Sequence, residues 1–232
     1  MKKVYAIVTA RKNSKSIKKK NISKIGNETL LSRSIKMLIE AKIFQEIFLS
    51  SDSEEYLKIG RANYIKTIKR PKKYSSDNAT SESVISHFLN FLKYNKIELP
   101  EIIFIIQPTS PFVNIETFKK ALRIYKNFDA GSVVSVIKTP HKYHFQNQRL
   151  ILKNNVAKFL FKKTSSLRQN KIETFVHGNL FSVRTSEFIK QKKILAKPVH
   201  TIKLKNSWES LDIDVFEELK LARIIIKNIK NL

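Results

Sequence analysis

The sequence contains no cysteine among its 232 residues, which excludes disulfide bonds, thiolate catalysis and zinc sites with cysteine ligands. Glycine is scarce, with four residues in the chain. Neither G-x-x-x-x-G-K-S/T nor G-x-G-x-x-G occurs, so P-loop ATPases and dinucleotide dehydrogenases do not fit. Any nucleotide site in this chain must therefore be built in another way.

Long apolar runs are missing as well. No run approaches the roughly 18 apolar residues that a membrane-spanning helix needs. The first apolar run is too short for the core of a signal peptide, and no cleavage-type site follows it. We therefore expect a cytoplasmic protein that contacts no membrane.

The composition is that of a folded protein, because 42% of the residues are hydrophobic. A chain of 232 residues is long enough for one large α/β domain, or for one domain with a sizeable insertion. We predict a single domain over residues 1–232.

The formal net charge of +26 suggests binding to nucleic acid. However, only nine of the 45 cationic residues are arginine, the residue most suited to reading bases. The excess of lysine accompanies many Asn and Ile residues, which indicates a genome rich in A and T codons. The lysines are also spread along the whole chain. We expect nonspecific attraction to polyanions and no specific nucleic-acid partner, and we keep a basic nucleic-acid-binding protein as an alternative.

Apolar runs alternate with segments of helical spacing along most of the chain. The runs that we read as strands lie at residues 4–8, 47–49, 65–68, 102–106 and 130–137. Helical spacing covers residues 28–41 with Asn27 as N-cap, a helix capped by Ser53, residues 81–94 and 115–127, and a C-terminal helix to about residue 229. This alternation predicts βαβ units and a mostly parallel sheet.

A basic loop over residues 10–22 follows the first predicted strand. Backbone N–H groups and cationic side chains in such a loop can converge on a phosphate. A solvated basic loop is the equally weighted alternative. Polar segments also follow the predicted strands at 65–68 and 102–106, and ligands of parallel sheets bind at that carboxyl edge.

Two carboxylates lie two residues apart near the C-terminus, at Asp212 and Asp214. On an extended segment both carboxylates would point to one face and could hold Mg²⁺ beside phosphates. Leu211 and Ile213 would then face the core, which fits a last strand that enters the sheet. Alternatively, Asp214 caps the final helix. His87, on a predicted helix, is better explained as a surface or packed residue than as a metal ligand.

Residues 138–199 show weaker helical spacing and short alternating runs, such as 156–161 and 179–183. We predict an inserted subregion of hairpins over about 138–199, serving as a lid or as a dimerisation arm. Half-buried strands explain its aromatic residues as well as a partner surface does.

Several ordered stretches together resemble the acylneuraminate cytidylyltransferases, also called CMP-sialic acid synthetases. They are Ala10-Arg11-x-x-Ser14-Lys15 with Lys20-Asn21-Ile22, then Ser51-Asp52-Ser53-Glu54, Arg70-Pro71 with Ser76-Asp77-x-Ala79-x-Ser81, Gln107-Pro108-Thr109-Ser110-Pro111, and Asp212-Ile213-Asp214. The resemblance runs from residue 3 to about residue 225. It implies a Rossmann-like nucleotidyltransferase fold, of GT-A-like three-layer architecture with a mostly parallel sheet and a hairpin insertion.

The resemblance also implies a reaction: the anomeric hydroxyl of a nonulosonic (sialic-type) acid attacks the α-phosphorus of CTP, and pyrophosphate leaves. Its implied residues are Arg11, Ser14, Lys20 and Asn21 for the triphosphate and nucleotide, Arg70, Ala79 and Ser81 around cytosine and ribose, Gln107 and Arg168 for the sugar acid, and Asp212 with Asp214 for Mg²⁺. Lys20, Arg11 and Asp212 would be the catalytic residues, with Lys20 neutralising charge at the α-phosphate. No residue stands out as the base.

The resemblance further implies a homodimer, in which Arg168 reaches the sugar carboxylate of the partner subunit. Departures are found on the sugar side, where an Asn-Gly pair typical of the family is replaced by His177-Gly178-Asn179. The acceptor is then sialic acid, legionaminic acid or another nonulosonate, and a Kdo-type enzyme fits less well. A catalytically inactive relative that serves as an interaction protein is the remaining alternative.

Overall fold

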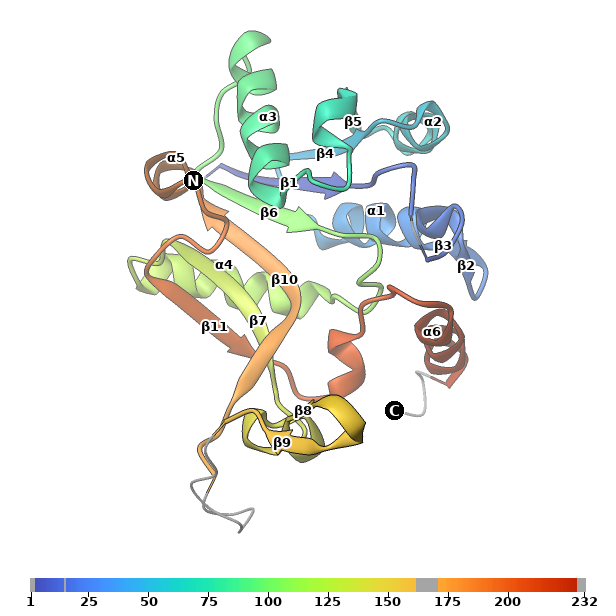
Figure 1. Ribbon diagram of the computed structural model, residues 1–232. Coiled ribbons are helices and arrows are strands. Elements are labelled where there is room, and N and C mark those ends of the chain that lie inside the picture. The colour runs from blue at the N-terminus through green and yellow to red at the C-terminus, as the bar shows by residue number, and fades with distance from the viewer. Residues whose placement is uncertain (1–2, 15, 162–170, 229–232) are drawn as a thin grey trace.

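A twisted seven-stranded sheet forms the centre of the computed structural model, which describes residues 3–14, 16–161 and 171–228 (Figure 1). In spatial order its strands are β11 (Val199–Lys203), β7 (Ser132–Lys138), β10 (Phe175–Arg184), β6 (Ile102–Ile106), β1 (Val4–Thr9), β4 (Glu46–Ser51) and β5 (Lys66–Lys69). Strand β10 runs antiparallel to both of its neighbours, and the other pairs are parallel. The predicted mostly parallel α/β sheet is confirmed.

Helices cover both faces of the sheet, which gives the predicted three layers. On one face lie α1 (Leu30–Ala41), α2 (Glu54–Ala62) and α4 (Ile115–Asn127), and on the other α3 (Ser81–Tyr94) and α5 (Thr185–Gln191). Two buried clusters result, one on each side of β1 and β6. Every residue of β6 is buried, as expected for a central strand.

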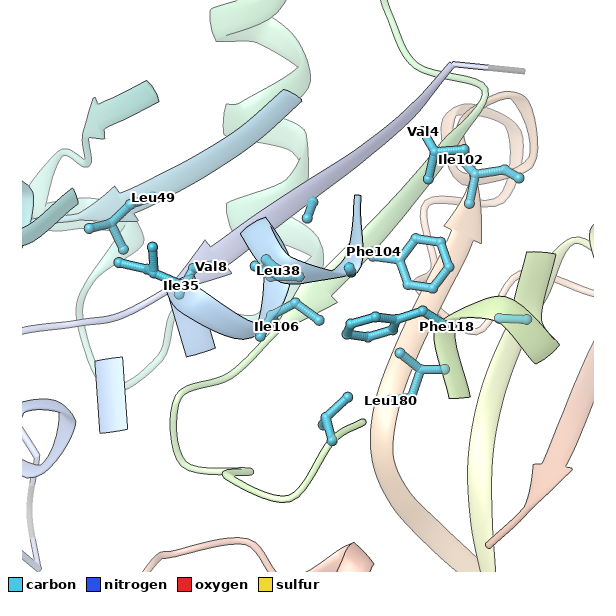
Figure 2. Packing of buried hydrophobic residues seen from close by; sticks show 14 of the residues in the cluster. Val4, Val8, Ile35, Leu38, Leu49, Ile102, Phe104, Ile106, Phe118 and Leu180 are labelled. Carbon is cyan, nitrogen blue, oxygen red and sulfur yellow. The ribbon is translucent and has the colours of Figure 1, made fainter. Parts of the chain in front are cut away.

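Aromatic side chains fill the larger of these clusters. Phe104 of β6 and Phe118 of α4 meet edge to face, with ring centroids 5.5 Å apart and planes at 81° (Figure 2). Phe44, in the loop before β4, contacts both rings at 5.3 and 5.4 Å. Such edge-to-face contacts add directional stabilisation to the burial of apolar area. They fix the position of β6, whose far end enters the candidate site.

Of two helix caps predicted from the sequence, one is confirmed and one is wrong. The side chain of Ser53 accepts a hydrogen bond from the Tyr56 N–H, so the predicted cap of α2 is confirmed. The expected cap Asn27 is wrong, because Thr29 caps α1 by accepting from the Ser32 N–H. Residues 26 and 27 instead form the turn of a small hairpin of β2 (Lys24–Ile25) and β3 (Glu28–Thr29), where Gly26 has a φ of 59°.

The predicted hairpin insertion needs new boundaries. A separate two-stranded hairpin does occur, with β8 (Arg149–Ile151) paired to β9 (Ala157–Phe159). However, the stretch 179–183 belongs to β10 and is paired with β6 and β7 in the central sheet. Its residues alternate between the two cores, with Leu180 in one and Val183 in the other, and a half-buried hairpin strand shows the same alternation. The proposed lid or dimerisation role stays a prediction.

Short 3₁₀ helices connect these elements. They are η1 (Lys20–Ile22), η2 (Lys72–Tyr74), η3 (His141–Tyr143), η4 (Phe145–Asn147), η5 (Lys153–Asn155) and η7 (Ser207–Ser210). Across the described ranges, no helix is long and apolar enough to cross a membrane.

The C-terminal helix α6 (Phe216–Asn228) lies beside the carboxyl edge of the sheet (Figure 1). Leu219, Ala222 and Ile225 of this helix belong to a third buried cluster. That cluster also contains Ile17 from the basic loop and Ile213 from between the two aspartates. Helix α6 therefore joins the segment that carries Asp212 and Asp214 to the first loop.

Candidate active site

A cavity of about 410 Å³ opens at the carboxyl ends of β1, β5 and β6. Its lining includes every predicted nucleotide and metal residue and one sugar residue: Arg11, Ser14, Lys20, Asn21, Arg70, Ala79, Ser81, Gln107, Asp212 and Asp214. Arg168, the other predicted sugar residue, lies outside the described residues. Segments far apart in sequence thus meet at one cavity, as the parallel sheet requires.

The basic loop is held in place by a hydrogen bond to the segment after β4 and by one within the loop itself. The Lys12 N–H donates to Asp52 Oδ1 at 2.8 Å, just beyond the end of β4. The Asn21 side chain is buried and its Nδ2 donates to the Arg11 carbonyl oxygen at 2.9 Å. Asn21 therefore shapes the loop backbone as well as lining the cavity, a role that its sequence position did not reveal.

Two cationic side chains of this loop are paired with acids at the cavity wall. Arg11 Nη1 lies 2.7 Å from Asp77 Oδ1, and Lys20 Nζ lies 2.9 Å from Asp214 Oδ1. The Lys20 side chain is 13% exposed whereas that of Asp214 is 73% exposed. Both cations are thus positioned at the cavity by partners that face solvent.

Arg70 is different, because it is buried without a full set of partners. Its residue is 5% exposed, and its backbone N–H donates to the Ser51 carbonyl oxygen at 2.8 Å. The Nε and Nη2 atoms are buried and make no hydrogen bond. Burial lowers the pKa of Arg70 to about 10, with Arg11 adding to the effect and Asp52 opposing it. A buried guanidinium with open donors favours a ligand that accepts hydrogen bonds.

The segment with Asp212 and Asp214 is not a strand, contrary to our expectation. It is a loop between η7 and α6, held by a 2.8 Å hydrogen bond from the Ile213 N–H to the Thr109 carbonyl oxygen. Ile213 is fully buried, as predicted, and Leu211 is partly buried. Leu211 and Ile213 pack into the third cluster and not against the sheet. Because the apolar and acidic residues still alternate, the sequence pattern resembles that of a strand.

The alternative role for Asp214, as cap of the final helix, is also wrong. Helix α6 begins at Phe216, and Glu218 accepts hydrogen bonds from the backbone N–H groups of Asp214 and Val215 at 2.6 and 2.9 Å. The carboxylate of Asp214 contacts Lys20 instead. Asp212 Oδ1 accepts a hydrogen bond from Ser110 Oγ at 3.3 Å.

The donor set fits Mg²⁺ only together with a substrate. Among the described residues no cluster of three or more His, Asp or Glu side chains could hold a metal ion by itself. Three carboxylates nevertheless line the cavity, and one of them, Asp77, is paired with Arg11. Mg²⁺ is commonly bound by one or two carboxylates plus substrate phosphates and water. Asp212 and Asp214 are therefore suited to a magnesium ion shared with a triphosphate.

The remaining wall comes from the connection between β5 and α3. Ala79 and Ser81 flank Thr80, whose side chain caps α3 by accepting from the Ser83 N–H. Tyr74 also lines this wall, and its ring packs against that of His87 at a centroid distance of 4.8 Å. His87 is thus a packed residue, as expected. Tyr74 was missed, because no spacing rule marks an aromatic residue in a lysine-rich turn.

Known proteins resemble this chain in sequence. It is 24% identical over 230 residues to the N-acylneuraminate cytidylyltransferase of Escherichia coli, covering 99% of this chain and 53% of that protein. It is 27% identical over 228 residues to the pseudaminic acid cytidylyltransferase of Campylobacter jejuni, covering 97% of each. The CMP-N,N'-diacetyllegionaminic acid synthase of Legionella pneumophila is 26% identical over 216 residues, covering 91% of each. The chain thus spans about half of the first relative and nearly all of the second.

Solved structures share the fold. A CMP:2-keto-3-deoxy-manno-octonic acid synthetase complexed with CTP superposes with a TM-score of 0.72 at 12% identity, covering 99% of this chain and 100% of that one. A 4-diphosphocytidyl-2C-methyl-D-erythritol synthase from Anaerococcus prevotii gives 0.65 at 13% identity, covering 97% and 99%. The family model described as cytidylyltransferase matches residues 5–230, and the chain belongs to that family.

Proposed function

We propose that this protein transfers CMP from CTP to the anomeric hydroxyl of a nonulosonic acid and releases pyrophosphate. The observation that carries the proposal is the convergence on one cavity of paired cations, a buried Arg70 with unsatisfied donors, and the carboxylates of Asp212 and Asp214. The relatives named for sialic, pseudaminic and legionaminic acids support the acceptor class.

In this reaction the sugar hydroxyl oxygen loses its proton and forms a bond to the α-phosphorus, while the bond from the α-phosphorus to the bridging oxygen of pyrophosphate breaks. Little covalent chemistry is left to the protein, so positioning and charge stabilisation supply the rate. Lys20 lines the cavity, and its ammonium group is oriented by Asp214. We assign to Lys20 the neutralisation of the negative charge that builds on the α-phosphate. Arg11 would contact the outgoing phosphates from the same loop.

Mg²⁺ would be held by Asp212 and Asp214 and would neutralise negative charge on the triphosphate. Asp212 is oriented for this by Ser110, and the Ile213 N–H anchors the segment to the loop after β6. Gln107 lies in the same loop and lines the cavity, so the acceptor would bind on this side. Arg168 would contact its carboxylate.

We also propose that the protein is a homodimer joined through the β8–β9 hairpin. Side chains of this hairpin are apolar and exposed: Leu150 is 47% exposed, Ile151 67%, Leu152 47% and Val156 56%. Exposed apolar side chains gathered on one short hairpin suit an interface with another protein chain. A second copy would cover them and could bring Arg168 to the partner's acceptor.

Turnover tests the proposal directly. Purified protein with CTP, Mg²⁺ and single nonulosonic acids should release pyrophosphate, and mass spectrometry should identify a CMP-sugar for at least one acid. CTP without acid is the control. Failure to release pyrophosphate across sialic, pseudaminic, legionaminic and Kdo acids would sink the assignment. CTP-dependent thermal stabilisation without turnover would instead favour an inactive relative.

Asp212→Asn should lower kcat at least about a hundredfold, the size of effect seen when one group that stabilises transition-state charge is lost. The midpoint of thermal unfolding should change little, because Asp212 is exposed. Glu217→Gln, five residues away on α6 and also exposed, should keep full activity. Unfolding of the Asp212 variant would assign that carboxylate a structural role.

Arg70→Met should weaken CTP binding while leaving the free protein as stable as before, or more stable. The reason is that methionine removes a buried charge with two unpartnered nitrogen atoms and keeps similar volume. Thermal unfolding with and without CTP measures both effects, because ligand stabilisation follows affinity. Arg61→Met, which removes an exposed ion pair with Glu54, is the control. A large loss of stability in the ligand-free variant would contradict the assignment.

The dimer is tested by light scattering. The wild-type chain should show twice its mass of 27.0 kDa, and Ile151→Asp combined with Val156→Asp should give the single-chain mass. Ile224→Asp changes an isoleucine of similar exposure, 61%, on α6 and should leave the dimer intact. A wild-type protein that is monomeric at micromolar concentration would refute the interface.

A further inference from the structure

Tyr74 is the only aromatic residue among the described residues that line the cavity. It is the last residue of the 3₁₀ helix η2, which begins directly after Pro71. The Tyr74 backbone N–H donates to the Pro71 carbonyl oxygen at 3.0 Å. Tyr74 is partly buried and lines the cavity, as do Ala79 and Val84. Tyr74 therefore adds an aromatic side chain to a lining that is otherwise mostly polar or charged.

His87 supports this ring from helix α3. The two rings lie 4.8 Å apart at 37°, and His87 Nδ1 is buried without a hydrogen-bond partner. Burial lowers the pKa of His87, and the nearby charges of Arg70 and Lys73 lower it further. The lowered pKa favours the neutral form of the imidazole, whose ring packs against Tyr74. Lys73 Nζ also contacts the Tyr74 ring, 4.8 Å from its centroid.

The cavity is divided by the elements that build it. Lys20, Asp212 and Asp214 come from the first loop and from the segment before α6. Tyr74, Ala79 and Val84 come from the connection between β5 and α3 and from α3 itself. Figure 1 shows α3 and α6 on different sides of the carboxyl ends of β1 and β6. The wall with Lys20 suits phosphates. The wall from the β5–α3 connection also carries Arg70 and Asp77, and it is distinguished by the aromatic ring of Tyr74, which suits a planar group.

We propose that Tyr74 contacts the base of the bound nucleotide and that His87 is a positioning residue that fixes the Tyr74 ring. This inference rests on the proposed cytidylyltransferase function and adds to it the pair of residues that sets affinity for the nucleobase. Aromatic contacts stabilise planar partners by amounts that correspond to roughly a few-fold to tenfold in affinity. The phosphates bind at the other wall and gain nothing from this pair.

Calorimetry with two probes, CTP and inorganic tripolyphosphate, each with Mg²⁺, separates the two walls. Tyr74→Ala should weaken CTP binding about tenfold and leave the affinity for tripolyphosphate unchanged. Tyr74→Phe should bind CTP like the wild type, because the ring remains. The control is Tyr143→Ala, since Tyr143 also ends a 3₁₀ helix, η3, and also lies beside a lysine, with Lys142 Nζ 4.7 Å from its ring centroid. Unlike Tyr74, it is not part of the cavity lining.

His87 is tested by a pair of variants. His87→Ala should weaken CTP binding about as much as Tyr74→Ala does, and His87→Phe should restore it, because Phe keeps a flat ring behind Tyr74. In turnover, His87→Ala should raise the KM for CTP while kcat stays within about threefold, as expected when a contact contributes equally to ground state and transition state.

The outcomes are distinguishable from failure of the proposed function. Wild-type protein that binds no CTP refutes that function. Wild-type protein that binds CTP while both alanine variants bind it equally well refutes the role of the ring pair. An equal loss of tripolyphosphate affinity in the variants, or no binding of tripolyphosphate to the wild type, refutes the division of the cavity. Unchanged tripolyphosphate binding also shows that a variant is folded.

Discussion

The alignment of parallel strands at one edge is the constraint on which the rest of this structure depends. Strands β1, β4, β5 and β6 run in the same direction, so the residues that follow each of them emerge together. Burial of β6 on both faces and the aromatic contacts of Phe104 fix the register of this edge. Each strand end then needs only a short polar segment to contribute to the cavity, and α6 closes it from the side.

Much of this arrangement could be predicted from the sequence, because its signals are local. Continuous apolar runs such as 102–106 indicate strands that are buried on both faces, and the alternation with helices implies that their carboxyl ends coincide. This argument predicts that Arg70, Gln107 and the basic loop lie at one site, and all of them contribute to the cavity lining. A second local signal predicted the cap at Ser53, where the capping serine directly precedes an acidic first turn.

The failures have a common physical cause, which is that nonlocal packing decides between locally equal patterns. The alternation around Leu180 fits a peripheral hairpin as well as a central antiparallel strand, and only pairing with β6 distinguishes them. Residues 211–214 alternate like a strand, but Ile213 is buried by α6 and not by the sheet. The contact of Tyr74 with His87 joins two elements whose approach no sequence period describes.

The cavity contains two kinds of cation: Arg11 and Lys20, whose acidic partners a ligand can replace, and the buried Arg70. The acids that pair with Arg11 and Lys20 both face solvent. The exposed pair of Arg11 with Asp77 contributes about 0–1 kcal/mol, so a phosphate can replace that acid at small cost. Arg70 is buried and rigidly placed, and its open donors cost free energy until a ligand accepts from them. Because that cost is already present in the free protein, a correct ligand recovers it on binding. The paired cations then attract any polyphosphate. Arg70 stabilises only a complex whose ligand reaches the buried end of the cavity and accepts its hydrogen bonds.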